Sequence, residues 1–175
     1  FIQSKMDDYT WNYFIHSVTN ADWSEHILAN PIGKPMTTLV SGETKGQLIG
    51  GNLTLVAASL GTPYEIDTKG KILFLEDIDE NEQRVDRMLT QVQLAGKLDD
   101  AAGFLLGAWT NCGPANPDHP ENSLPLSTIF NEILVPLNKP TLMDVTCGHC
   151  LPTMSLPLGR TIRFNADSQI IKVEG

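Results

Sequence analysis

The sequence is poor in cysteine and in basic residues, and it lacks any long apolar run. Its 175 residues include three cysteines, Cys112, Cys147 and Cys150. This odd and sparse set fits a reducing compartment better than a disulfide framework. No apolar run approaches the roughly 20 residues that span a bilayer, and no basic segment followed by an apolar one opens the chain. We therefore expect neither a membrane protein nor a secretory signal peptide.

The shortage of positive charge also bears on the choice of partner. The chain has 12 Lys and Arg against 21 Asp and Glu, a formal net charge of −9. Because nucleic acids bind to clusters of basic side chains, and no such cluster is present, nucleic acid is not an expected partner. The length is that of one domain, or of one domain with an appendage. The chain does not begin with Met, so we interpret it as a fragment of a longer protein or as a processed chain.

The segment Lys71 to Asp77, K-I-L-F-L-E-D, is the clearest strand of the sequence. Its four consecutive apolar residues are typical of a strand buried on both faces in a parallel sheet. Glu76 falls where this strand should end, at the edge where open α/β sheets place their ligands and their chemistry. The alternative is that Glu76 and Asp77 only cap the next helix.

Two further strands and two helices follow in a β-α-β-α-β order. The strands are predicted at 71–77, 103–109 and 141–145, and the helices at 79–96 and 127–137. Asp79 and Glu82 resemble a capping box at the start of the first of these helices. Right-handed crossovers would make the three strands parallel, with their C-terminal ends on one edge. That edge would hold Glu76, the loop 109–112 and the turn 146–150.

The two ends of the chain have patterns that differ from the alternating strands and helices of its middle. An amphipathic helix is predicted at 7–18, and its Trp11 and Phe14 are expected to be partly exposed. Hairpins are predicted at 37–49 and at 160–173. The expected fold is therefore α/β with three layers: helices, a short parallel sheet, and a smaller antiparallel sheet.

A glycine-rich turn, Gly50-Gly51-Asn52, precedes another helix. Asn52 is a favourable cap for that helix, and the free N–H groups at its start could hold an anion. Because glycines and caps are common structural features, the anion role is the less favoured alternative.

His149 is the histidine placed most like a catalytic group. It follows the third strand in C-G-H-C, so the topology alone would bring it to the edge that holds Glu76. A carboxylate that accepts the imidazole N–H fixes the tautomer, and the other ring nitrogen can then take a proton from a nucleophile. The alternative is a histidine that only ties down a loop.

A nucleophile for this pair is missing from the predicted elements. Ser59 falls inside a helix, and Ser155 lies between apolar residues, whereas a nucleophilic serine belongs on a sharp turn between strand and helix. Neither Cys147 nor Cys150 opens a helix that would activate a thiol. A zinc site made of Cys112, Cys147, His149 and Cys150 is disfavoured, since Cys147 and His149 are separated by one residue and Cys112 is distant. The other histidines, predicted to be surface residues, are His16, His26 and His119.

Several motifs between residues 46 and 159 resemble those of the LD-carboxypeptidase family. They are G-Q-L-I-G-G-N-L-T-L at 46–55, G-T-P-Y at 61–64, K-I-L-F-L-E-D at 71–77, R-V-D-R-M-L-T-Q at 84–91, and G-H followed by L-P-L-G at 148–159. The family comprises the muramoyltetrapeptide carboxypeptidases and their microcin C immunity relatives, and it uses a Ser-Glu-His triad. The resemblance implies that residues 37–175 are the C-terminal domain, of swivelling β/β/α type, and that residues 1–36 connect it to an N-terminal domain absent from this chain.

The resemblance also implies a function and a set of partners. The catalytic glutamate would be Glu76 and the histidine His149, while the serine would lie in the N-terminal domain. The reaction would remove the terminal D-alanine from murein tetrapeptides during cell-wall recycling in the bacterial cytoplasm, without a cofactor, and a homodimer is possible. The isolated chain would be inactive. A microcin C immunity-type peptidase, or a non-catalytic binding module using the Gly-Gly-Asn turn or a Cys/His metal turn, are the alternatives. The role of Cys147 and Cys150 stays open.

Overall fold

The computed structural model describes residues 6–19 and 22–175. Residues 1–5, 20 and 21, which belong to the predicted connector, lie outside this description. The helices are α1 Asp8–Thr19, α2 Leu53–Ser59, α3 Glu82–Leu94, α4 Lys97–Asp100 and α5 Leu126–Leu134, with short 3-10 helices at Pro120–Asn122 and Val135–Leu137. The strands are β1 Ile27–Leu28, β2 Thr37–Val40, β3 Glu43–Asn52, β4 Ile72–Ile78, β5 Gly103–Thr110, β6 Thr141–Met143, β7 Thr161–Asn165 and β8 Ile170–Val173.

The strands form one curled sheet with the order β1-β8-β7-β3-β4-β5-β6-β2. β3, β4, β5 and β6 run parallel to one another, and the predicted crossovers require this of β4, β5 and β6. The long strand β3 belongs to both halves of the sheet. Its residues 43–47 pair with β7 in antiparallel fashion, and its residues 48–52 pair with β4 in parallel fashion. The sheet therefore turns from a parallel half into an antiparallel half along a single strand.

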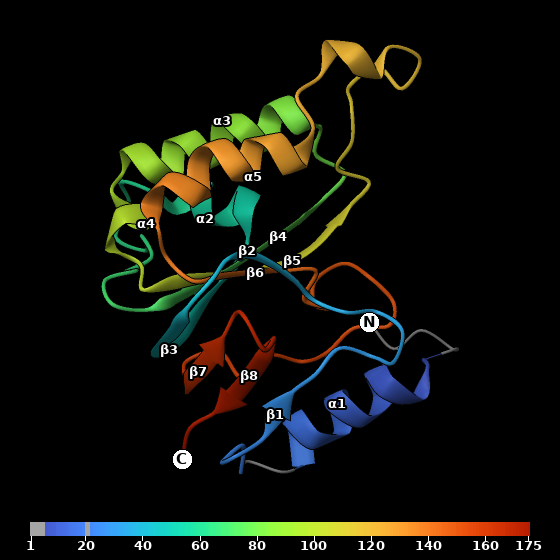
Figure 1. Cartoon of the computed structure of the whole chain (residues 1–175), viewed down its shortest axis with the longest axis vertical. Coiled ribbons are helices and arrows are strands. Elements are labelled where there is room, and N and C mark those ends of the chain that lie inside the picture. Colours follow the sequence, from blue (N-terminus) through green and yellow to red (C-terminus); the bar gives the residue numbers. More distant parts are fainter. Residues whose placement is uncertain (1–5, 20–21) are drawn as a thin grey trace.

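Two cores lie on the two faces of the parallel strands. On the face that we call the helix side, Leu73 and Leu75 pack against α2, α3 and α5. On the face that we call the hairpin side, Ile72 and Phe74 pack against β7 and β8. The period of two along a strand explains why a continuous apolar run serves both cores. Figure 1 shows the result as helices above, the parallel strands in the middle, and the antiparallel strands with α1 below. This arrangement confirms the predicted fold class.

The predicted hairpin at 37–49 is wrong. β2 pairs with β6 at one end of the sheet, whereas β3 lies between β7 and β4. The apolar pattern predicted only the centre of β3 as a strand, because the rest of β3 is polar and rich in glycine. At Gly50, where φ is +119°, a Cβ atom would lie 2.0 Å from the carbonyl oxygen of Phe74. The glycine therefore permits a close approach between the backbones of β3 and β4.

The N-terminal segment packs on the hairpin side. α1 has nearly the predicted bounds, and the expected exposure of its apolar stripe is confirmed, since Trp11 is 44% exposed and Phe14 is half-buried. Its opposite face packs inward through Tyr9 and Tyr13. After α1, the short strand β1 adds to β8, and buried apolar side chains join the hairpin-side core: Trp23, Leu28 and Met36.

Asparagines cap the starts of α2 and α3. The side chain of Asn52 accepts from the N–H of Leu55 and caps α2, as predicted. The predicted capping box at the start of α3 is wrong, because Asn81 is the cap and accepts from the N–H of Arg84. Asp79 instead occupies a turn with a φ of +59°. No helix in the described ranges is long and apolar enough to cross a membrane.

Candidate active site

The structure brings Glu76 and His149 into contact at the C-terminal edge of the parallel strands. Nδ1 of His149 lies 2.9 Å from Oε2 of Glu76, and the backbone N–H of His149 donates to the same oxygen over 3.2 Å. The two residues are 73 positions apart in the sequence. A carboxylate oxygen only accepts hydrogen bonds, so Nδ1 carries a proton in this contact, and in the neutral imidazole Nε2 is then the acceptor. The predicted meeting of the two side chains is therefore confirmed.

Each member of the pair is held in a different way. Glu76 follows Ile72 and Phe74 at intervals of two along β4, so its side chain points to the hairpin side, and it is 5% exposed. His149 sits on the loop after β6, and 41% of its side chain is exposed. This loop is fastened to β5, since Val145 N–H donates to Leu106 O over 3.1 Å and Ala108 N–H donates to Cys147 O over 2.9 Å.

Gly148 allows the loop to pass directly over the carboxylate. Its φ is +116°, and a Cβ atom there would lie 2.6 Å from Oε2 and 3.0 Å from Cβ of Glu76. Any side chain at this position would therefore displace Glu76 or the loop. The glycine next to His149 belongs to the G-H motif, but sequence alone does not reveal this steric requirement.

A cleft of about 750 Å³ opens beside His149. Its walls come from α1, from the last residues of β4 and β5, and from the loop that carries His149; they include Thr10, Phe14, Ile78, Thr110, Leu151 and Thr153. Nε2 of His149 has no hydrogen-bond partner among the described residues, so this nitrogen can accept a proton from a molecule that enters the site.

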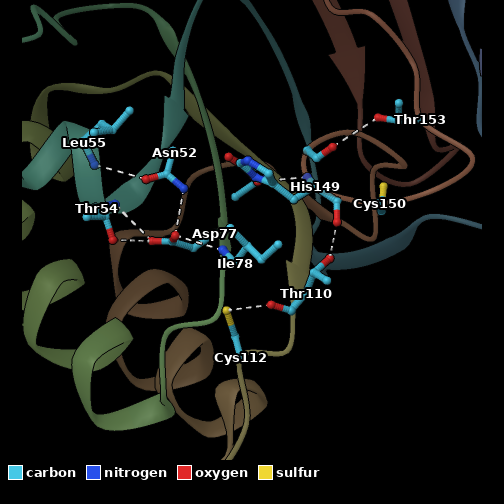
Figure 2. A network of polar contacts seen from close by, with 12 residues as sticks. Asn52, Thr54, Leu55, Asp77, Ile78, Thr110, Cys112, His149, Cys150 and Thr153 are labelled. Atoms are coloured by element: carbon cyan, nitrogen blue, oxygen red, sulfur yellow. Dashed lines mark hydrogen bonds and ion pairs between the residues drawn. The ribbon is translucent and has the colours of Figure 1, made fainter. Parts of the chain in front are cut away.

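Asp77, the neighbour of Glu76, faces the other way. Its carboxylate accepts from Asn52 Nδ2 over 2.7 Å, and from the N–H and the hydroxyl of Thr54 over 3.0 and 2.9 Å (Figure 2). It also accepts from the N–H of Ile78. The alternative that these acids cap the next helix is therefore wrong, since Asn81 caps α3 and Asp77 instead holds the start of α2, which precedes it. The suggested anion position at the Gly-Gly-Asn turn is filled by this internal carboxylate.

The two serines that were weighed as nucleophiles, Ser59 and Ser155, have other hydrogen-bond partners. The hydroxyl of Ser59 donates to the carbonyl of Val56, inside α2. The hydroxyl of Ser155 lies 3.5 Å from that of Ser17, and no hydrogen bond joins it to His149 in the described parts of the chain. Neither serine completes a triad with Glu76 and His149.

The thiols beside His149 are not activated. Burial raises the pKa of the Cys147 thiol to about 12, with further contributions from Cys150 and Glu76. Burial also raises the pKa of Cys150 and that of Cys112. Low thiolate content makes a cysteine a poor nucleophile and a poor metal ligand. Within residues 6–19 and 22–175, no three His, Cys, Asp or Glu side chains gather as a metal site would require, so the zinc alternative has no support.

Two histidines are not the surface residues that the sequence suggested. The rings of His16 and His26 stack with their centres 4.6 Å apart, and both meet the buried ring of Trp23 edge-on. The apolar packing of the segment after α1 creates this cluster, and sequence position alone does not reveal it. His119, in contrast, lies in an exposed loop beside Glu121, as predicted.

Comparison with known proteins identifies the family. The family sequence model described as "LD-carboxypeptidase C-terminal domain" matches residues 45–164. A probable murein peptide carboxypeptidase of Bacillus subtilis (strain 168) is 42% identical over 140 residues, which cover 80% of this chain and 43% of that protein.

Solved structures agree with the sequence match. A muramoyltetrapeptide carboxypeptidase from Oxalobacter formigenes superposes with a TM-score of 0.75 at 27% identity, covering 98% of this chain and 56% of that chain. The microcin C7 self-immunity protein MccF, in complex with aspartyl sulfamoyl adenosine, superposes with a TM-score of 0.80 at 22% identity, covering 99% and 57%. This second likeness shows the fold alone. The chain spans about half the length of the relatives that it matches. It belongs to the LD-carboxypeptidase family, and its residues 45–164 match the C-terminal domain of that family.

Proposed function

We propose that this chain is the catalytic-partner half of a serine carboxypeptidase that removes the terminal D-alanine from murein tetrapeptides. The observation that carries the proposal is the 2.9 Å contact between Nδ1 of His149 and Oε2 of Glu76, on an imidazole that borders an open cleft. The identity with a probable murein peptide carboxypeptidase supports this class of substrate. A microcin-type substrate has weaker support, because the microcin C7 self-immunity protein MccF is 26% identical over 136 residues.

In the proposed reaction, His149 is the general base and then the general acid. Glu76 accepts a hydrogen bond from Nδ1–H, which keeps Nε2 unprotonated before the reaction and stabilises the imidazolium that forms. Nε2 takes the proton of a serine hydroxyl as that oxygen attacks the carbonyl carbon before the D-alanine. The same proton then passes to the amine of D-alanine as the C–N bond breaks, and water releases the acyl group by the reverse sequence of proton transfers.

The nucleophile in this proposal is supplied from outside the 175 residues, by an N-terminal domain of the same longer protein. The described serines support this, since Ser59 and Ser155 are engaged elsewhere. Residues 1–36 would connect the two domains, and the protein would act in the cytoplasm without a cofactor.

Release of D-alanine from a muramyl tetrapeptide tests the proposal directly. The longer protein that carries this chain should release D-alanine, and His149→Ala in that protein should remove the activity. The 175-residue chain alone should be inactive, and it should not be labelled by a fluorophosphonate. Turnover by the chain alone would contradict an external nucleophile, and full activity of His149→Ala would contradict the assigned base.

A further inference from the structure

The main chain of His149 is fixed on both sides by side chains from two neighbouring strands. Its N–H donates to Oε2 of Glu76, at the end of β4. Its carbonyl oxygen accepts from the hydroxyl of Thr110, the last residue of β5, over 2.7 Å (Figure 2). The two strands are themselves paired at this level, with Ile78 opposite Thr110. The peptide groups around the imidazole are therefore tied to the C-terminal ends of two paired strands.

We propose that Thr110 is a positioning residue that acts through His149, an inference that rests on the proposed catalytic role of the histidine. The hydroxyl of Thr110 fixes the carbonyl of His149, so the ring can move only by rotation about its own side-chain bonds. The hydrogen bond from Nδ1 to Glu76 then selects one orientation of the ring and one tautomer.

The need for such a residue follows from the exposure of His149. With 41% of its side chain exposed, the imidazole has few packing neighbours to hold it. Its loop has no regular secondary structure between β6 and β7. A misplacement of about 1 Å at a reacting group can lower a rate by about 100-fold. A hydrogen bond to the carbonyl oxygen of His149 therefore helps to keep the ring in the position that its contact with the Glu76 carboxylate sets.

Thr110 is well suited to be the fixed end of this contact. Its carbonyl oxygen accepts from the N–H of Asp79 over 2.9 Å, which holds its main chain to the end of β4. A β-branched side chain has restricted rotation about its first bond, so the hydroxyl is held in one direction at a small entropic cost. The requirement is for a donor hydroxyl, which serine retains and valine, of similar shape, lacks.

The test uses Thr110→Val and Thr110→Ser in the 175-residue chain, with folding checked by circular dichroism and thermal unfolding. The ring nitrogens of His149 are followed by ¹⁵N NMR. In the wild-type chain and in Thr110→Ser, Nδ1 should carry the proton and Nε2 should not. In Thr110→Val, the two nitrogen shifts should move toward the values of a tautomer mixture. The exchange rate of the His149 amide hydrogen should also rise about fivefold to tenfold, the effect of losing one hydrogen bond.

Two results would overturn the proposal. The first is a folded Thr110→Val chain whose ring shifts and amide exchange equal those of the wild type. The second is a Thr110→Ser chain that behaves like Thr110→Val, because the hydroxyl would then not be the cause.

A rate measurement separates this inference from the proposed function. In the longer protein, Thr110→Val should lower kcat for D-alanine release about tenfold with little change in KM, and Thr110→Ser should restore most of it. An inactive wild-type protein would refute the proposed function and leave the NMR result standing. An active protein whose Thr110→Val form keeps its full kcat would refute the positioning role alone.

Discussion

The two faces of the parallel strands treat neighbouring carboxylates in opposite ways. On the helix side, Asp77 is 1% exposed and is surrounded by donors from Asn52, Thr54 and Ile78. On the hairpin side, Glu76 is 5% exposed, yet its partner is the half-exposed His149 at the edge of a cleft. Burial alone therefore does not distinguish the structural acid from the acid that we propose to be catalytic. The difference lies in the partner of each carboxylate. The donors around Asp77 are all bound within the protein, whereas His149 borders a cleft that a further molecule can enter.

The largest expected difference between the two acids is in catalysis. In the longer protein, Glu76→Gln should lower kcat for D-alanine release by up to about 10⁴-fold, because the amide can stabilise the wrong tautomer of His149. Asp77→Asn, which keeps the shape of its side chain, should lower kcat less than about tenfold. Steady-state rates of the two purified variants provide the comparison. Similar losses in both would mean that the helix side takes part in the chemistry.

A second contrast lies in two glycines on loops at the same edge of the sheet. Gly148→Ala should lower kcat by about 100-fold, since its Cβ would meet the Glu76 carboxylate at 2.6 Å and shift the reacting groups. Gly113→Ala is the matched control, because a Cβ there meets no atom within 4 Å. Kinetics and thermal unfolding of both variants test this. Equal activity in the two variants would show that the loop can yield without moving His149.

Stability should reverse the order of the two acids. Asp77→Ala would leave the amide of Asn52 and the N–H and hydroxyl of Thr54 without their acceptor, so we expect a loss of about 3 kcal/mol in the free energy of unfolding. Glu76→Ala should lower the free energy of unfolding less, by about 1 kcal/mol, because water can hydrogen-bond to the exposed imidazole of His149 once the carboxylate is removed. Asp118→Ala, in an exposed loop, is the control. Urea unfolding of the three variants measures these differences, and a larger loss for Glu76→Ala would contradict the distinction.

The sequence predicted one of these two environments well and the other poorly. Apolar runs and crossover order were enough to place Glu76 and His149 on one edge, because parallel strands leave little choice about where their C-terminal ends lie. The partners of Asp77 were missed, since they come from a helix that precedes it in the chain. The predicted hairpin failed for a similar reason. β3 pairs through its backbone with strands that are distant in sequence, so the types of its side chains do not indicate which strands it pairs with.

The smallest expected effect concerns pH and is confined to the hairpin side. Burial, together with the neighbouring His16, lowers the pKa of His26 below its usual value of 6.5. The unfolded chain therefore binds the proton more readily, so this group favours the folded state above pH 6.5 and loses that contribution as the pH falls through this value toward the lowered pKa. Urea unfolding of the wild-type chain between pH 7 and pH 5 should show a decrease in stability that is smaller in His26→Gln.

His119→Gln provides the matched control for this measurement, because His119 lies in an exposed loop and packs against neither core. It should keep the pH dependence of the wild type. Near pH 5.5, the protection of amide hydrogens against exchange should decrease first in α1 and β1. The packing of this region includes Tyr13, His16 and Trp23 around His26. The amides of α3 and α5 should stay protected, since no histidine packs into the helix-side core of the described residues. Uniform loss of protection on both sides would show that acid acts on the whole fold, and that the two faces of the sheet do not differ in this respect.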